Sequence, residues 1–127
     1  MRFLVDTHSL IWFLTGNEKL PSAAKQAIEN PDALKFVSIA SVWEMAIKVS
    51  IGKLKFENGF KNFLELIEEN GFQILPISTE HALSLATLEF IHRDPFDRLL
   101  IAQAKVENLT IITSDENIKQ YSVSVLN

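Results

Sequence analysis

The chain has 127 residues, the size of one ordinary domain, and 47% of them are hydrophobic, enough to bury a core. It contains no cysteine, which excludes disulfides and thiolate metal sites and fits a reducing cytoplasm. The net charge of −4 excludes a general electrostatic attraction to nucleic acid, so any such contact requires a local basic patch.

No run of about 18 apolar residues is present, so we expect no membrane span. The apolar start is interrupted by Asp6 and His8 and lacks a small-residue cleavage site, which argues against an export signal. We therefore expect one cytoplasmic domain over residues 1–127.

In chain order, short β-rich runs alternate with longer helical patterns. The predicted strands cover residues 2–5, 34–38, 72–77, 109–113 and 121–126. The predicted helices cover residues 7–15, 22–29, 41–51, 60–70, 80–88 and 95–107. Gly52 and Gly59 mark a turn, so residues 41–70 should form a helical hairpin. This alternation predicts an α/β fold in which helices cover both faces of a parallel sheet.

Four of the five aspartates lie at predicted helix starts. Asp6 ends the first strand, Asp115 follows the fourth strand by two residues, and Asp94 and Asp97 open the helix before that strand. Ligands of open α/β sheets bind at the carboxyl ends of the strands. Each aspartate alone is explained equally well as a helix N-cap.

The stretch "DPFD" separates two roles. Asp94 precedes Pro95, a favoured first helical residue, and is the predicted cap. Asp97 is then free of capping and shares a helical face with apolar Leu100 and Ile101. A carboxylate beside a core face is costly unless it is paired with a cation or binds a metal.

Glu44 is the fourth candidate acid. Ser41 and Glu44 form the Ser-x-x-Glu pattern of a capping box, and Lys48 lies four residues on in the favourable orientation for an ion pair. Against these structural interpretations, the residues around Glu44 are largely apolar, which indicates a buried helix.

Four gathered carboxylates would repel one another, and a divalent cation would remove that repulsion. An all-oxygen ligand set suits Mg²⁺ or Mn²⁺, which can polarise a phosphate and lower the pKa of bound water. The natural reaction of such a site is phosphodiester hydrolysis.

The order of these motifs resembles the PIN-domain ribonucleases, specifically the VapC-type toxins of type II toxin–antitoxin pairs. The resemblance covers nearly the whole chain. It is carried by four stretches, which are "FLVDTH" with Asp6, "SVWE" with Glu44, "DPFDRLLIAQA" with Asp97 and "LTIITSDE" with Asp115.

The resemblance implies a Rossmann-like three-layer domain with strand order 3-2-1-4-5. It implies an endoribonuclease in which these four acids hold one or two Mg²⁺ or Mn²⁺ ions, with the hydroxyls of Thr7 and Thr113 nearby. It also implies a homodimer inhibited by a cognate antitoxin, whose tail enters the acidic groove.

Two further features each admit two interpretations, and two of the histidines are isolated. Residues 48–61 carry four lysines against one glutamate, with Phe56 and Phe60 interleaved. They form an RNA-binding strip or, as we favour, a solvated hairpin whose phenylalanines are core or dimer contacts. Arg98 contacts a phosphate or forms a surface salt bridge. His81 and His92 have no partner at metal-ligand spacing.

Two rival functions remain at this point. A receiver-type phospho-acceptor domain would need adjacent acids after the first strand and an acceptor aspartate after a middle strand, but Thr7 follows Asp6 and "FQILPIS" ends without an acid. A non-catalytic binding module of the same fold would use the acids as caps alone.

Overall fold

The computed structural model describes residues 1–127 and contains a five-stranded parallel sheet. Its strands are β1 (Arg2–Val5), β2 (Leu34–Ser38), β3 (Gln73–Leu75), β4 (Thr110–Ile112) and β5 (Val125–Leu126). The spatial order is β3-β2-β1-β4-β5. Both the α/β class predicted from the alternation and the strand order implied by the resemblance are confirmed.

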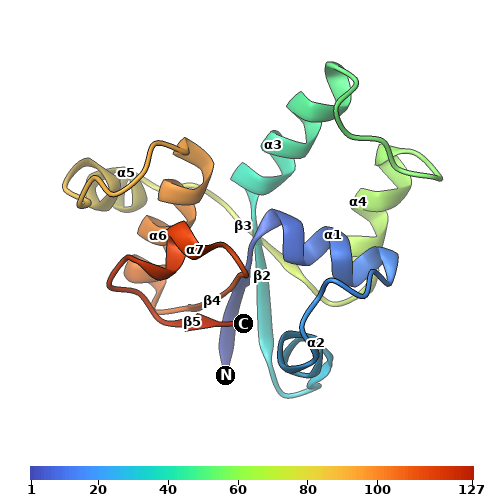
Figure 1. The fold of residues 1–127 in the computed structure, drawn as a ribbon, viewed down its shortest axis with the longest axis horizontal. Coiled ribbons are helices and arrows are strands. Elements are labelled where there is room, and N and C mark those ends of the chain that lie inside the picture. The colour runs from blue at the N-terminus through green and yellow to red at the C-terminus, as the bar shows by residue number, and fades with distance from the viewer.

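Seven helices cover the sheet, and Figure 1 shows them divided between its two sides. On one side lie α1 (Thr7–Thr15), α2 (Ser22–Glu29), α3 (Ile39–Ser50) and α4 (Phe60–Glu69). On the other side lie α5 (Thr79–Ala86), α6 (Pro95–Glu107) and the single turn α7 (Glu116–Lys119). None of these helices combines the length and the apolar character needed to cross a bilayer.

The central strand β1 faces two separate cores because successive side chains of a strand point to opposite faces. Phe3 and Val5 pack into the core beneath α1 to α4, whereas Leu4 packs into the core beneath α6 and α7. The same division occurs in β4, where Ile112 joins the first core and Ile111 the second. This burial on both faces explains the continuous apolar runs of the two strands.

Three predicted strands are shorter in the structure, and β4 loses only one residue at each end of the predicted run. Strand β3 ends at Leu75, immediately before Pro76, which has no N–H to donate to a neighbouring strand. The run predicted over residues 121–126 begins with a turn, because the backbone N–H of Tyr121 donates to Ile118 O and closes α7. Only Val125 and Leu126 remain to pair with β4.

The capping box predicted at Ser41 and Glu44 is wrong. Helix α3 begins two residues earlier, since the Ser38 hydroxyl accepts the N–H of Ala40 at 3.0 Å and is the N-cap. Ser41 is therefore inside the helix, where its hydroxyl is buried without a partner. Glu44 is released from capping and lies one turn further into the helix.

The segment predicted as a helical hairpin contains helices α3 and α4, and α1 contacts both of them. The connecting loop is held by aromatic packing: the Phe56 ring stacks on Phe63 at 4.1 Å and on Phe60 at 5.8 Å between centroids. These rings pack against the first core. Phe56 and Phe60 are thus half-buried against this core, in line with the favoured interpretation of them as packing contacts.

Asp94 is the N-cap of α6, as predicted: its carboxylate accepts the backbone N–H groups of Phe96 at 2.9 Å and Asp97 at 3.1 Å. We expect Asp94→Ala to lower the free energy of unfolding by about 1 kcal/mol, because two N–H groups lose their acceptor. Asp94→Ser should retain most of the stability, since serine is also a good cap. Urea denaturation of both variants measures the difference, and equal losses would contradict the assignment.

Candidate active site

Asp6 lies at the carboxyl end of β1 and is also the N-cap of α1. One carboxylate oxygen accepts the N–H of Ser9 at 2.9 Å, and the other accepts the hydroxyl of Thr113. The side chain is only 5% exposed, and this burial raises the pKa of Asp6 above its ordinary value of 3.8, against the opposing effect of the two hydrogen bonds. A buried carboxylate of this kind favours a bound proton or a cation.

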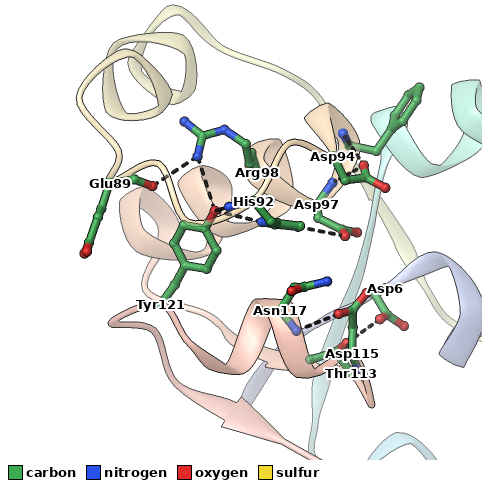
Figure 2. A network of polar contacts seen from close by, with 11 residues as sticks. Asp6, Glu89, His92, Asp94, Asp97, Arg98, Thr113, Asp115, Asn117 and Tyr121 are labelled. Carbon is green, nitrogen blue, oxygen red and sulfur yellow. Dashed lines mark hydrogen bonds and ion pairs between the residues drawn. The ribbon is translucent and has the colours of Figure 1, made fainter.

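Thr113 connects two of the candidate acids across neighbouring strands. Its hydroxyl donates to Asp6 and accepts the backbone N–H of Asp115 at 3.0 Å. Asp115 is the N-cap of α7, where its carboxylate accepts the N–H of Asn117 at 2.8 Å. Figure 2 shows Asp6, Thr113 and Asp115 gathered at the ends of their strands.

Glu44 projects from α3 toward the start of α1. One of its oxygens accepts the hydroxyl of Thr7 at 2.8 Å, and the other pairs with the ammonium of Lys48 at 3.2 Å. The predicted ion pair with Lys48 is thus confirmed. Because Thr7 follows Asp6 directly, this hydrogen bond connects Glu44 to the segment that carries Asp6.

Asp97 lies in the first turn of α6, and its carboxylate points away from the cap Asp94 (Figure 2). Burial raises the pKa of Asp97 to about 6, the hydrogen bond from His92 opposes this rise, and the carboxylates of Asp94 and Asp115 add to it. The contribution of Asp115 indicates that two segments 18 residues apart in sequence share one electrostatic environment.

Two surface hollows border these acids. One, of about 260 Å³, is lined by Asp6, Asp115 and their neighbours His8, Trp12 and Ser114. The other, of about 390 Å³, contains Glu44 and Asp94 together with the cations Lys48 and Arg93. Asp6, Asp115 and Glu44 therefore border surface hollows, whereas Asp97 lines neither of them.

The four acids lie toward one edge of the sheet, but no three of them come together in a group that could hold a metal ion as the side chains stand. Asp97 is turned toward His92, and Glu44 toward Thr7 and Lys48. The chemistry of the donors nevertheless fits a hard divalent cation, since all are carboxylate oxygens and both the buried Asp6 and the half-buried Asp97 have raised pKa values. A cation there would replace the contact between Asp97 and His92 or share the carboxylate with it.

Arg98 has neither of the two roles considered from the sequence, a phosphate contact or a surface salt bridge. It is 8% exposed, and its guanidinium donates to the carbonyl of Glu89 at 3.0 Å and to the hydroxyl of Tyr121 at 3.2 Å. It forms no salt bridge and does not reach the surface as a phosphate ligand would.

Two further residues contact this site: His92, to which the sequence assigns no role, and Tyr121, which no sequence pattern singles out. The imidazole Nε2 of His92 lies 3.1 Å from Asp97, and its Nδ1 lies 2.8 Å from the hydroxyl of Tyr121. The five-residue separation of His92 from Asp97 follows neither helical nor strand periodicity, and Tyr121 comes from a distant turn. Only the fold brings these groups together.

Three comparisons with known proteins bear on this site. The family model described as "PIN domain" matches residues 3–123. Ribonuclease VapC22 of Mycobacterium tuberculosis is 25% identical over 118 residues, which cover 93% of this chain and 90% of the relative.

Solved structures with the same fold include VapBC2 from Rickettsia felis bound to a promoter DNA fragment, with a TM-score of 0.74, 16% identity and coverage of 100% of this chain and 98% of that chain. FitAcB from Neisseria gonorrhoeae has a TM-score of 0.65, 21% identity and coverage of 98% and 96%. At these identities the structures establish the fold alone.

The raised pKa of Asp97 predicts a pH-dependent stability. Above about pH 4 the carboxyl ionises in the unfolded chain but keeps its proton in the folded one, so this group's stabilisation is present at low pH and is lost as the pH rises through about 6. Asp97→Asn cannot ionise and should raise the free energy of unfolding at pH 7, without metal, by about 1 to 2 kcal/mol. The gain should vanish below pH 4.

Denaturation in EDTA across this pH range measures the effect. Asp32→Asn removes an exposed turn carboxylate and is the matched control, which should leave stability unchanged. A destabilised Asp97→Asn at pH 7 would show that its charge is compensated within the protein.

Proposed function

This chain belongs to the PIN-domain family, and on that premise we propose that it is a metal-dependent endoribonuclease of the VapC type, the toxin of a toxin–antitoxin pair. The observation that carries the proposal is the arrangement of its acids. Asp6, Asp97 and Asp115 come from separate segments and lie toward one edge of the sheet (Figure 2), where open α/β folds bind their ligands, and Glu44 is hydrogen-bonded to Thr7, the residue after Asp6.

Asp6 and Asp97 are the proposed principal ligands of Mg²⁺ or Mn²⁺, with Asp115 completing the set directly or through water. A bound divalent cation would polarise the scissile phosphate, neutralise its charge and lower the pKa of a water molecule. The carboxylates of the buried Asp6 and the half-buried Asp97, whose pKa values are raised, suit this role because a cation would stabilise the charged form of both.

Hydroxyl groups fix the orientation of the acids. Thr113 and the N–H of Ser9 hold the two oxygens of Asp6, and each oxygen keeps capacity for a further contact. Thr7 and Lys48 hold Glu44 at the border of the hollow that Lys48 and Arg93 also line. From there Glu44 would ligate a second cation or orient the attacking water.

The hollow beside Glu44 supports RNA as the substrate. Arg93, which pairs with no carboxylate, and Lys48, which pairs with Glu44, bring local positive charge to this hollow although the whole chain is acidic, and phosphates bind such side chains. Next to it, Trp43 is 61% exposed and meets the ring of Phe96 edge-on at 5.6 Å. An exposed ring of this kind provides a stacking surface for an unpaired base.

An antitoxin is the proposed protein partner, because the structures of VapBC and FitAB that share this fold are toxin–antitoxin complexes. A largely apolar hollow of about 480 Å³ between α3, α4 and the edge strand β3 provides a surface for it. A homodimer is the proposed oligomeric state.

The rival functions differ in what they require of the acids. A receiver-type domain is excluded by the family match and by the residue after Asp6, which is Thr7 rather than an acid. A non-catalytic module of the same fold would leave Asp6 and Asp115 as helix caps and would bind no Mg²⁺.

The test is cleavage of single-stranded RNA by the purified chain with Mg²⁺ or Mn²⁺. We expect activity that EDTA abolishes, and a loss of about 100-fold or more in Asp6→Asn and Asp97→Asn, the size expected when a group that stabilises transition-state charge is removed.

The control is Asp32→Asn, which makes the same chemical change in an exposed turn and should cleave like the wild type. Thermal unfolding of each variant shows that the fold is kept. Wild-type cleavage rates in Asp6→Asn and Asp97→Asn would refute the ligand assignment, and metal-independent cleavage would refute the proposed chemistry.

A further inference from the structure

The carboxylate of Asp97 has one protein partner, the imidazole of His92. Nε2 of His92 lies 3.1 Å from Oδ2 of Asp97, and no protein group binds Oδ1. His92 belongs to the loop before α6, so this contact is not part of the helix cap, which Asp94 provides. Whether the contact holds Asp97 in place depends on which ring nitrogen of His92 carries the proton.

The hydroxyl of Tyr121 determines that choice. Its oxygen accepts the backbone N–H of His92 at 3.2 Å and an N–H of the Arg98 guanidinium at 3.2 Å. Two donors occupy the accepting positions of the oxygen, so its single proton is left for the third neighbour, Nδ1 of His92, at 2.8 Å. In the neutral imidazole Nδ1 is then the acceptor, and Nε2 carries the proton.

Arg98 cannot reverse this direction, because a guanidinium only donates hydrogen bonds. It is held in place by the carbonyl oxygens of Glu89 and Leu88 and lies 4.7 Å from the centroid of the Phe90 ring. Burial of its side chain protects the arrangement from water. Figure 2 shows the resulting chain of contacts from Arg98 through Tyr121 and His92 to Asp97.

We infer that Arg98 and Tyr121 fix His92 as the Nε2–H tautomer, and that His92 is thereby a positioning residue that directs Asp97 as a ligand of the proposed metal. The N–H of His92 holds Oδ2 and leaves Oδ1 for the cation. This inference rests on the proposed function for the role of Asp97, while the tautomer itself does not depend on it. Hydrogen-bonded supports of ligating carboxylates commonly alter metal affinity by about 10- to 100-fold.

The first experiment measures the tautomer by long-range ¹H–¹⁵N NMR of the imidazoles, in EDTA, at a pH about two units above the ordinary histidine value of about 6.5. Wild-type His92 should give the pattern of an Nε2–H ring. Tyr121→Phe removes the directing proton and should shift His92 toward a mixture of tautomers. The signals of His8 and His81 are internal controls and should not change.

The second experiment measures Mn²⁺ affinity by calorimetry. His92→Phe should weaken binding about 10- to 100-fold, with a smaller loss in Tyr121→Phe. His92→Gln should recover most of the affinity, because the amide nitrogen of glutamine is as many bonds from Cα as Nε2 of histidine. This rescue distinguishes a donated hydrogen bond from simple ring packing, and thermal unfolding confirms that each variant is folded.

The outcomes test two statements separately: the tautomer of His92 and its role in positioning Asp97. An Nδ1–H ring in the wild type, or no change in Tyr121→Phe, overturns the relay whatever the protein catalyses. Wild-type Mn²⁺ affinity in His92→Phe overturns the positioning role but leaves the proposed nuclease intact. Failure of the wild type to bind Mn²⁺ refutes the metal assignment of the proposed function and, with it, the role of His92 toward a ligand.

Discussion

The hydrogen bond from Thr113 to Asp6 is the interaction on which the arrangement of the site depends. It joins the carboxyl ends of β1 and β4, which lie side by side in the parallel sheet. Asp6 also starts α1, and the Thr113 hydroxyl accepts the N–H of Asp115 ahead of α7. A single buried contact therefore holds together the ends of two neighbouring strands and positions the two carboxylates that follow them, those of Asp6 and Asp115. The hydrogen bond between Thr7 and Glu44 extends the same arrangement to α3.

Capping a helix and serving the site are not exclusive roles in this molecule. Asp6 and Asp115 each cap a helix with one oxygen, and the sequence interpretation that treated capping as the competing explanation was too simple. Only in "DPFD" are the roles divided between residues. Asp94 satisfies the free N–H groups of α6, so the Asp97 carboxylate is free of capping and lies against His92, where burial raises its pKa.

Local patterns were sufficient for most of the fold. Strand β1 and helices α1, α2 and α6 have the predicted bounds, because apolar periodicity, caps and proline act within a few residues. The start of α3 was misjudged since two serines, Ser38 and Ser41, both suit a cap and only tertiary packing selects between them. Likewise, the contacts of Arg98 and His92 depend on Tyr121 from a distant turn, which no local pattern encodes.

The central claim is that carboxylates from separate segments share one divalent cation, and the most direct measurement is a crystal structure of the chain grown with Mn²⁺, with the metal located by anomalous scattering. The account predicts Mn²⁺ about 2.1 Å from oxygens of both Asp6 and Asp97, with Asp115 in direct or water-mediated contact. Mn²⁺ bound elsewhere, or held by only one of these aspartates, would contradict it.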